Sequence, residues 1–314
     1  MSAADMKKRK ALTADQKREA GLFYLIITPF LLMFLFIKLV PMVNGVYLSM
    51  TNYAGYNYNR LKFVGLRNYL RVFTDNDAVF TLLQTFKIGL ITVPISMIVG
   101  LLTALLLNNA RKGVYVFRTI AFLPSIIPGV ATGLMWKIMF NKDAGLINHL
   151  LNMLGVSSVA WLEYDYVMYA LIIMMTWGST GSLLINLAAL KDIPEQMYEA
   201  AALDGANAWQ KFWKITIPMI SPVLFFNLIM NIISNLQLYS QPVLLAQGVN
   251  GVLNMPLRPV MTYMVHAYQQ ILGYLRYGYG LAMVWVLVII INLLTVLVFK
   301  TQKYWVFYAD GGDK

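Results

Sequence analysis

Residues 199–218 read EAAALDGANAWQKFWKITIP, a short polar segment between two stretches that are apolar enough to cross a membrane. The segment combines a helix-forming run, the helix-ending Gly205 and a second helix-forming run. A loop that only joins two membrane helices has no need of such a compact arrangement. The segment therefore predicts a projecting surface feature to which a soluble partner docks.

The composition of the chain predicts an integral membrane protein. Its 314 residues are 59% hydrophobic and 12% charged, whereas soluble domains carry about 25% charged residues. The mean hydropathy is +0.62, and about 20 apolar residues in a helix cross the hydrocarbon core of a bilayer. Six stretches meet this length and predict an all-α fold with six transmembrane helices: Leu22–Leu48, Leu82–Leu107, Val114–Phe140, Tyr166–Leu190, Ile215–Tyr239 and Tyr277–Phe299.

Basic residues are distributed unevenly about these stretches. The net charge is +11, and six basic residues lie between Lys7 and Arg18. With both termini in the cytoplasm, the inner side holds 15 basic residues and the outer loops hold 7, as the positive-inside rule requires. Three further lysines lie near the outer ends of spans: Lys38, Lys87 and Lys137. If they are counted as outer, the comparison becomes 15 inner against 10 outer basic residues. The distribution predicts cytoplasmic termini and does not favour nucleic acid as a partner.

The chain offers little for catalysis or metal binding. It has no cysteine and two widely separated histidines, His149 and His266, which make neither a thiolate site nor a metal cluster. Residues 178–182 read GSTGS, but a nucleophilic serine needs an adjacent base, and neither histidine lies within a span. We therefore predict no catalytic residue, no metal and no cofactor in this chain, and no enzymatic activity.

The start of the polar segment carries helix-capping residues. Asp192 can cap a helix, Pro194 suits its first turn, and Glu195 can complete a capping box. Gly205 is placed to end this helix, and a second helical stretch follows at 208–215. From these residues alone, two roles are equally open. The helices either dock to a protein or lie on the bilayer surface.

Polar residues inside two spans lie at helical spacing. In the fifth span Asn227, Asn231 and Ser234 share a face with Gln241, flanked by Asn235 and Gln237; in the fourth, Ser179, Ser182 and Asn186 share one. Neutral amides and hydroxyls suit the hydroxyls of a sugar. The same residue types also hold membrane helices together, so helix contact is the alternative.

The acidic residues bear on a rival function, an ion-coupled secondary transporter of small polar solutes. Such coupling generally needs a carboxylate inside the membrane. All 14 acidic residues fall in tails, loops or the polar segment, and none in the middle of a span. This pattern disfavours the rival.

The polar segment follows the pattern E-A-A, three residues, G, nine residues, I-x-L-P. It is matched by Glu199, Ala200, Ala201, Gly205, Ile215 and Pro218, with Ile217 in place of leucine. In this the chain resembles the permease subunits of binding-protein-dependent ABC importers. Three more stretches are similar to the carbohydrate, maltose-type branch: FVGLRNYLRVF at 63–73, the run at 117–141, and LYSQPVLLAQG at 238–248. The maltose permease itself has extra spans and a large external domain, which six spans do not provide.

The resemblance implies the type I importer permease fold, with a cytoplasmic tail at 1–20, a permease domain at 21–303 and a second tail at 304–314. Its coupling loop, 191–214, would dock on an ATP-hydrolysing subunit. No phosphate-binding G-x-x-x-x-G-K-[ST] motif occurs in this chain, so ATP and Mg²⁺ would be bound by partner subunits. The residues expected to couple are Glu195, Glu199, Ala200, Ala201, Leu203, Asp204, Gly205, Ile215 and Pro218.

The resemblance also implies where a solute passes and what surrounds it. Ser179, Ser182, Ser234 and Gln237 align with positions of the family's sugar pocket, and we add Asn227 and Asn231 from the helical face. The implied partners are a second homologous permease, two ATPase subunits, an external solute-binding protein and a sugar or oligosaccharide. A polyol or glycerol phosphate stays open as the solute. The implied location is the cytoplasmic membrane of a bacterium.

Overall fold

The computed structural model describes residues 14–308 except 57, 110–112 and 246–255. Across these residues the fold is helical, as predicted, with no β-strand beyond one isolated antiparallel bridge between Thr51 and Phe63. The basic tail before Ala14, the residues Arg111, Lys112 and Lys314, and the end of the stretch 238–248 lie outside the described residues.

Five of the described helices are long and apolar enough to cross a membrane. Several contain a local change of helix type, which prolines and short polar runs favour. In chain order they are α1 (Ala14–Met33) with the π-helical turn η1 (Phe34–Leu39) and α2 (Val40–Ser49); α4 (Asn76–Asn109); α8 (Val167–Gly178) with the 3₁₀ turn η3 (Ser179–Ser182) and α9 (Leu183–Lys191); α11 (Ala208–Lys211) with the π-helical turn η4 (Phe212–Thr216) and α12 (Ile217–Leu236); and α15 (Tyr277–Trp305).

The third predicted span, Val114–Phe140, is not one straight helix. It consists of α5 (Val114–Ile126) and α6 (Gly129–Met139), which meet at 102°. Ile127 between them is extended, with φ −71° and ψ 129°, because the ring of Pro128 disfavours the helical conformation in the residue before it. The predicted span is therefore a bent pair of helices: α5 runs beside the other spans and α6 turns across their ends.

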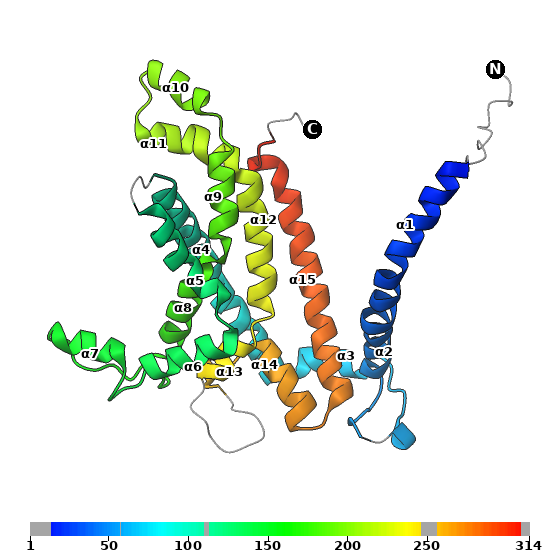
Figure 1. The fold of residues 1–314 in the computed structure, drawn as a ribbon. Helices are drawn as coiled ribbons and strands as arrows, with labels where there is room; N and C mark the ends of the chain where they lie inside the picture. The colour runs from blue at the N-terminus through cyan, green and yellow to red at the C-terminus, as the bar shows by residue number, and fades with distance from the viewer. Residues whose placement is uncertain (1–13, 57, 110–112, 246–255, 309–314) are drawn as a thin grey trace.

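The spans form a bundle with two unlike ends (Figure 1). One end carries α10 (Glu195–Leu203), the start of α1 and the end of α15, and we call it the α10 end. The other, the α14 end, is crossed by short helices: α3 (Arg67–Thr74), α6, α7 (Leu146–Met153), α13 (Ser240–Leu245), α14 (Tyr263–Tyr268) and the turn η6 (Gln269–Gly273). Two 3₁₀ turns, η2 (Tyr58–Arg60) and η5 (Arg258–Val260), complete the described elements.

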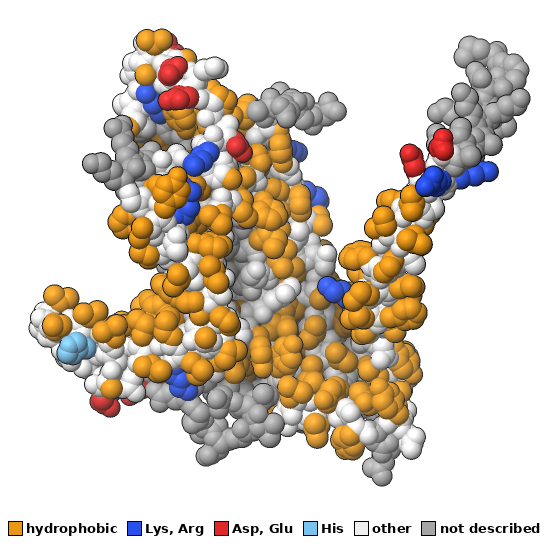
Figure 2. Space-filling model, in the orientation of Figure 1, with side chains coloured by type: hydrophobic (Ala, Val, Ile, Leu, Met, Phe, Trp, Pro, Cys, Tyr) orange, Lys and Arg blue, Asp and Glu red, His pale blue; other side chains and the backbone are white. Residues whose placement is uncertain are grey.

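The surface follows this division. Hydrophobic side chains cover the sides of the spans, and acidic side chains gather around α10 and the start of α1 (Figure 2). The first span leans away from the bundle in Figure 1, and its most apolar window has no buried residue. Three apolar clusters hold the rest together, one of them joining α4, α9 and α12 through Ala104, Leu183 and Ile220.

Candidate functional site

The polar segment forms a hairpin that projects from the α10 end (Figure 1). We call residues 192–207 the α10 hairpin. Its first helix begins at Glu195 after Pro194, without a side-chain cap. The predicted cap at Asp192 is wrong, because Asp192 ends α9 instead and donates its N–H to the carbonyl of Ala188.

A capping box does occur, but after α10, at the end of the hairpin. The N–H of Gln210 donates to Asn207 Oδ1, and the N–H of Asn207 donates to Gln210 Oε1, each at 2.9 Å. This pair begins α11, and the pattern N-x-x-Q in the sequence was the signal for it. The second helical stretch thus begins at Ala208 as predicted.

Gly205 ends α10 as predicted. Its φ of +78° lies in the left-handed region, which glycine adopts without a Cβ penalty. The N–H of Ala206 donates to the carbonyl of Ala201 at 2.8 Å, and the N–H of Gly205 donates to that of Ala202 at 3.1 Å. These two bonds form a Schellman motif, which satisfies the last carbonyls of the helix.

The tip of the hairpin is left uncovered. Leu203 is 91% exposed, and Ala200 and Ala202 on the same helix are exposed too. The carboxylates Glu199 and Asp204 form no ion pair within the described part of the chain. The tip therefore presents an exposed apolar side chain among small residues, with unpaired charges at its margins.

The base of the hairpin is fixed to the spans. Ile193 is buried in the cluster that joins α4, α9 and α12, and Tyr198 and Ile215 pack against it. The hydroxyls of Tyr198 and Thr216 share a hydrogen bond of 2.8 Å, which links α10 to the start of the fifth span. The base of the hairpin is therefore in contact with both α9 and the start of the fifth span. Pro218 lies half-buried in the first turn of α12.

Three asparagines on α12 form a buried ladder, which we call the asparagine ladder: Asn227, Asn231 and Asn235. Asn231 donates to the backbone carbonyl of Asn227 at 2.8 Å, and Asn235 to that of Asn231 at 2.9 Å. Asn227 and Asn235 are only 6% and 5% exposed.

The side chains of the ladder bind two neighbouring spans. Asn227 donates to Asn186 Oδ1 on α9 at 2.8 Å, and Asn235 accepts from Thr92 on α4. The amides at both ends of the ladder are thus used between helices. Whether Asn227 also meets a solute stays a prediction, and its burial favours the helix-contact alternative.

The serines of the fourth span lie on a break in the helix. Ser179 and Ser182 bound the 3₁₀ turn η3, and both are half-buried. Ser179 Oγ donates to the carbonyl of Thr176 at 2.6 Å. Gly100 of α4 packs on this turn, since a Cβ there would lie 2.6 Å from Ser182 Oγ. The sequence GSTGS was the signal for the break.

Ser234 and Gln237 are the predicted pathway residues left exposed, with Asn231 half-buried beside them. Gln237 follows the last residue of α12. Gln241 lies beyond the end of that helix, in α13, so the prediction that it continues the α12 face is wrong. The open polar groups are therefore at the end of α12 that is nearer the α14 end.

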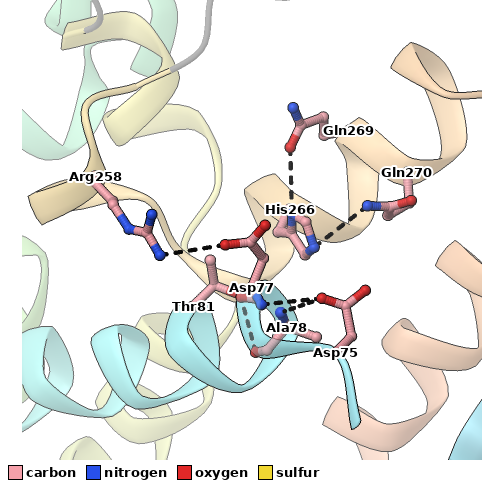
Figure 3. A network of polar contacts seen from close by, with 8 residues as sticks. All are labelled: Asp75, Asp77, Ala78, Thr81, Arg258, His266, Gln269 and Gln270. Atoms are coloured by element: carbon pink, nitrogen blue, oxygen red, sulfur yellow. Dashed lines mark hydrogen bonds and ion pairs between the residues drawn. The ribbon is translucent and has the colours of Figure 1, made fainter. Parts of the chain in front are cut away.

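A polar network at the α14 end was not predicted (Figure 3). Asp75 caps α4, since its Oδ1 accepts the N–H of Asp77 at 3.0 Å and that of Ala78 at 3.3 Å. Partial burial raises the pKa of Asp75, but the hydrogen bonds from Tyr279, Ala78 and Asp77 outweigh it and hold the pKa below 3.8. The sequence signal was the short D-x-D pattern before the second span.

His266 lies at the centre of this network, on α14. Its Nδ1 is 3.3 Å from Gln269 Oε1, and its Nε2 is 3.4 Å from Gln270 Nε2. Burial lowers the pKa of His266 below 6.5, against the opposite effects of Gln269, Asp75 and Asp77. These two contacts join α14 to the turn η6 that follows it. The second histidine, His149, lies on the separate helix α7.

Comparison with known proteins identifies the family. Residues 96–305 match the family described as the binding-protein-dependent transport system inner membrane component. The probable ABC transporter permease protein YesP of Bacillus subtilis is 38% identical over 309 residues, which cover 97% of this chain and 96% of that protein. The trehalose/maltose transport system permease protein MalF of Thermococcus litoralis is 35% identical over 243 residues, 76% of this chain and 82% of that protein.

A solved structure shares the fold. It is the crystal structure of a bacterial alginate ABC transporter in complex with an alginate pentasaccharide-bound periplasmic protein. One of its chains matches with a TM-score of 0.76 and 21% identity, over 92% of this chain and 96% of that chain. The resemblance predicted from the E-A-A pattern is confirmed: this chain belongs to the family of inner membrane components of binding-protein-dependent transport systems.

Proposed function

We propose that this chain is the membrane-spanning half of an ATP-driven sugar importer, coupled to a separate ATPase through the α10 hairpin. The names of relatives support a sugar as the solute, since they include a trehalose/maltose and a lactose permease. The observation that carries the coupling role is the bare tip of the hairpin, where Leu203 is 91% exposed on a base fixed in the bundle.

In this proposal α10 enters a cleft on the ATPase. Its tip is slim because Ala200, Ala201 and Ala202 follow one another, and Glu195, Glu199 and Asp204 supply charges at its margins. Leu203 provides the apolar contact. Closure of the ATPase would then move α10, and the Tyr198–Thr216 hydrogen bond and the packing of Ile193 would pass that movement to α12 and α9.

The proposed solute pathway runs along the open polar groups near η3 and the end of α12. Ser179, Ser182, Asn231, Ser234 and Gln237 are the candidate contacts, since they are half-buried or exposed. Their hydroxyls and amides can donate to and accept from sugar hydroxyls without a countercharge. Asn227 is assigned to the contact between α12 and α9 instead, because its amide already pairs with Asn186.

The α10 end is proposed to face the cytoplasm of a bacterium and the α14 end the exterior. The excess of basic residues on the side of the termini supports this orientation. A second homologous permease would complete the pathway, two ATPase subunits would bind ATP and Mg²⁺, and an external binding protein would deliver the solute. The alginate complex, which contains a periplasmic protein, supports that last partner.

The ion-coupled transporter is the competing function. No acidic side chain lies in the middle of a described span; Asp77, for example, lies in the first turn of α4. The importer therefore accounts better for a membrane interior that holds neutral amides and hydroxyls.

Cross-linking tests the proposal directly, because the chain has no cysteine of its own. Leu203→Cys should form a cross-link to the ATPase subunit in the complex purified from its native host. Leu154→Cys is the matched control and should form none, because Leu154 is also an exposed leucine (78%) but lies after α7 at the α14 end. A Leu203→Cys variant that reacts only with lipid, or uptake that follows an ion gradient without ATP, would overturn the proposal.

A further inference from the structure

A cavity lies at the α14 end, apart from the proposed solute pathway. It is a cavity of about 730 Å³ between the segment after α2, the helix α3 and the start of α15. Three arginines line it: Arg67 and Arg71 from α3, and Arg276 from the turn before α15. Its size is that of an ordinary small-ligand pocket.

The three arginines have no counter-ion of their own. Within the described part of the chain, none of them forms an ion pair. Asp75 is already engaged, since its Oδ1 accepts two backbone N–H groups and its Oδ2 accepts from Tyr279 at 2.9 Å. The guanidinium of Arg71 lies over the ring of Tyr279, 4.5 Å from its centroid. Three unpaired positive charges around one cavity select an anion.

The walls of the cavity are fixed before any ligand binds. The N–H of Gly278 donates to the carbonyl of Tyr53 at 2.9 Å, and a Cβ at Gly278 would lie 2.1 Å from the carbonyl oxygen of Thr51. Leu275, which also lines the cavity, has φ +53° and is the one non-glycine residue with positive φ among those described. A bulky residue in this conformation is costly and is found mainly where function requires it. Arg276 follows Leu275 directly and lines the same cavity.

The exposed side of α3 indicates which kind of anion the cavity binds. Leu66, Leu70 and Phe73 are 61%, 67% and 64% exposed, and their spacing places them on one stripe beside the arginines. The helix lies at the α14 end of the bundle, near the ends of α2 and α15 (Figure 1), and it packs against α15. A short helix with an exposed apolar stripe and flanking arginines is typical of a membrane interface.

We propose that this cavity binds the phosphate of an anionic phospholipid headgroup, with the acyl chains along the Leu66–Phe73 stripe. Guanidinium groups bind phosphate oxygens through paired, charge-assisted hydrogen bonds. The ligand is a lipid and not a free anion, because the cavity is continuous with the stripe through Leu70, which lines it. The inference needs only that the spans cross a membrane and is independent of the solute.

Native mass spectrometry of the complete transporter tests the site. The complex is titrated with phosphatidylglycerol or phosphatidylcholine, and the bound lipids are counted. Wild type should retain phosphatidylglycerol and lose phosphatidylcholine. The triple variant Arg67→Gln, Arg71→Gln, Arg276→Gln should bind phosphatidylglycerol roughly a hundredfold more weakly, given the usual contribution of each basic residue at a membrane surface.

Arg258→Gln is the matched control, since Arg258 lies at the same end but pairs with Asp77 outside the cavity. Its phosphatidylglycerol binding should equal that of wild type. Thermal unfolding without added lipid checks that each variant is folded; if the triple variant is not, the single variant Arg276→Gln should still lose several-fold. Unchanged binding by folded variants overturns the proposal. Displacement of the lipid by equimolar glycerol 3-phosphate also overturns it. So does a triple variant that loses only its affinity for the binding protein, because the cavity would then be a docking surface.

Discussion

The α10 hairpin and the asparagine ladder both carry polar side chains on helices, yet they differ in what those side chains contact. In the hairpin, Leu203 and Glu199 contact nothing else in the described chain that would bury or pair them. In the ladder, Asn227 and Asn235 are buried and donate to carbonyl oxygens of the chain. Side chains left free at the surface are available to a partner, whereas side chains bonded between helices stabilise the bundle.

Substitutions in the hairpin should therefore abolish transport without lowering the stability of the protein. Gly205→Val should abolish uptake, because a β-branched residue at φ +78° costs about 1–2 kcal/mol and unwinds the Schellman motif that sets the angle of α10. Nothing lies within 4 Å of a Cβ at this position, so the bundle should be unaffected. Uptake into vesicles measures the first effect and thermal unfolding in detergent the second.

Gly205→Asn is the matched control for this change. Asparagine adopts the left-handed conformation more readily than valine, so this variant should retain most of the uptake. Normal uptake by Gly205→Val would mean that the geometry of the hairpin does not matter to transport.

The exposed polar groups beside the ladder should show a smaller effect, again on function. Replacing Ser234 and Gln237 together with leucine would remove the proposed hydrogen bonds to the solute, each worth about 0.5–1.5 kcal/mol. Uptake should fall roughly five- to hundredfold while basal ATP hydrolysis by the complex persists. Met230→Leu, an exposed change on the same helix, should leave uptake intact. A double variant with an unchanged substrate profile would place the solute elsewhere.

The sequence alone predicted different shares of the fold and of the candidate site. The apolar stretches located five spans, because length and hydrophobicity suffice where a helix crosses lipid. Hydropathy does not give the sharp bend at Ile127, because the hydropathy of 114–140 is the same whether the chain runs straight or turns. The preference of a residue before proline for extended backbone was the available signal.

Within the site, local signals were read more reliably than those that depend on neighbours. Gly205 ends a helix because of its own backbone, and it did so where expected. The prediction that Asp192 caps α10 was wrong, because Asp192 ends α9 and the next residue, Ile193, is buried against the bundle. Spacing placed Asn227 and Ser234 on one face of the same helix, but the packing of α9 against Asn227 leaves Asn227 buried and Ser234 exposed.

The smallest expected effect is on the ladder and concerns stability. Asn227→Leu leaves the Oδ1 of Asn186 without its donor, and side-chain hydrogen bonds between membrane helices are worth about 0.6 kcal/mol on average. Asn186→Leu should cost a similar amount, and the double variant should cost less than the two together, because neither amide is then left unpaired. Thermal unfolding of the four proteins completes the cycle, with solute affinity measured in parallel. Strictly additive losses of stability would mean that Asn227 and Asn186 do not stabilise each other. A loss of solute affinity in Asn227→Leu as large as that in the Ser234 and Gln237 variant would place Asn227 in the pathway. Either result would remove the distinction between the two regions.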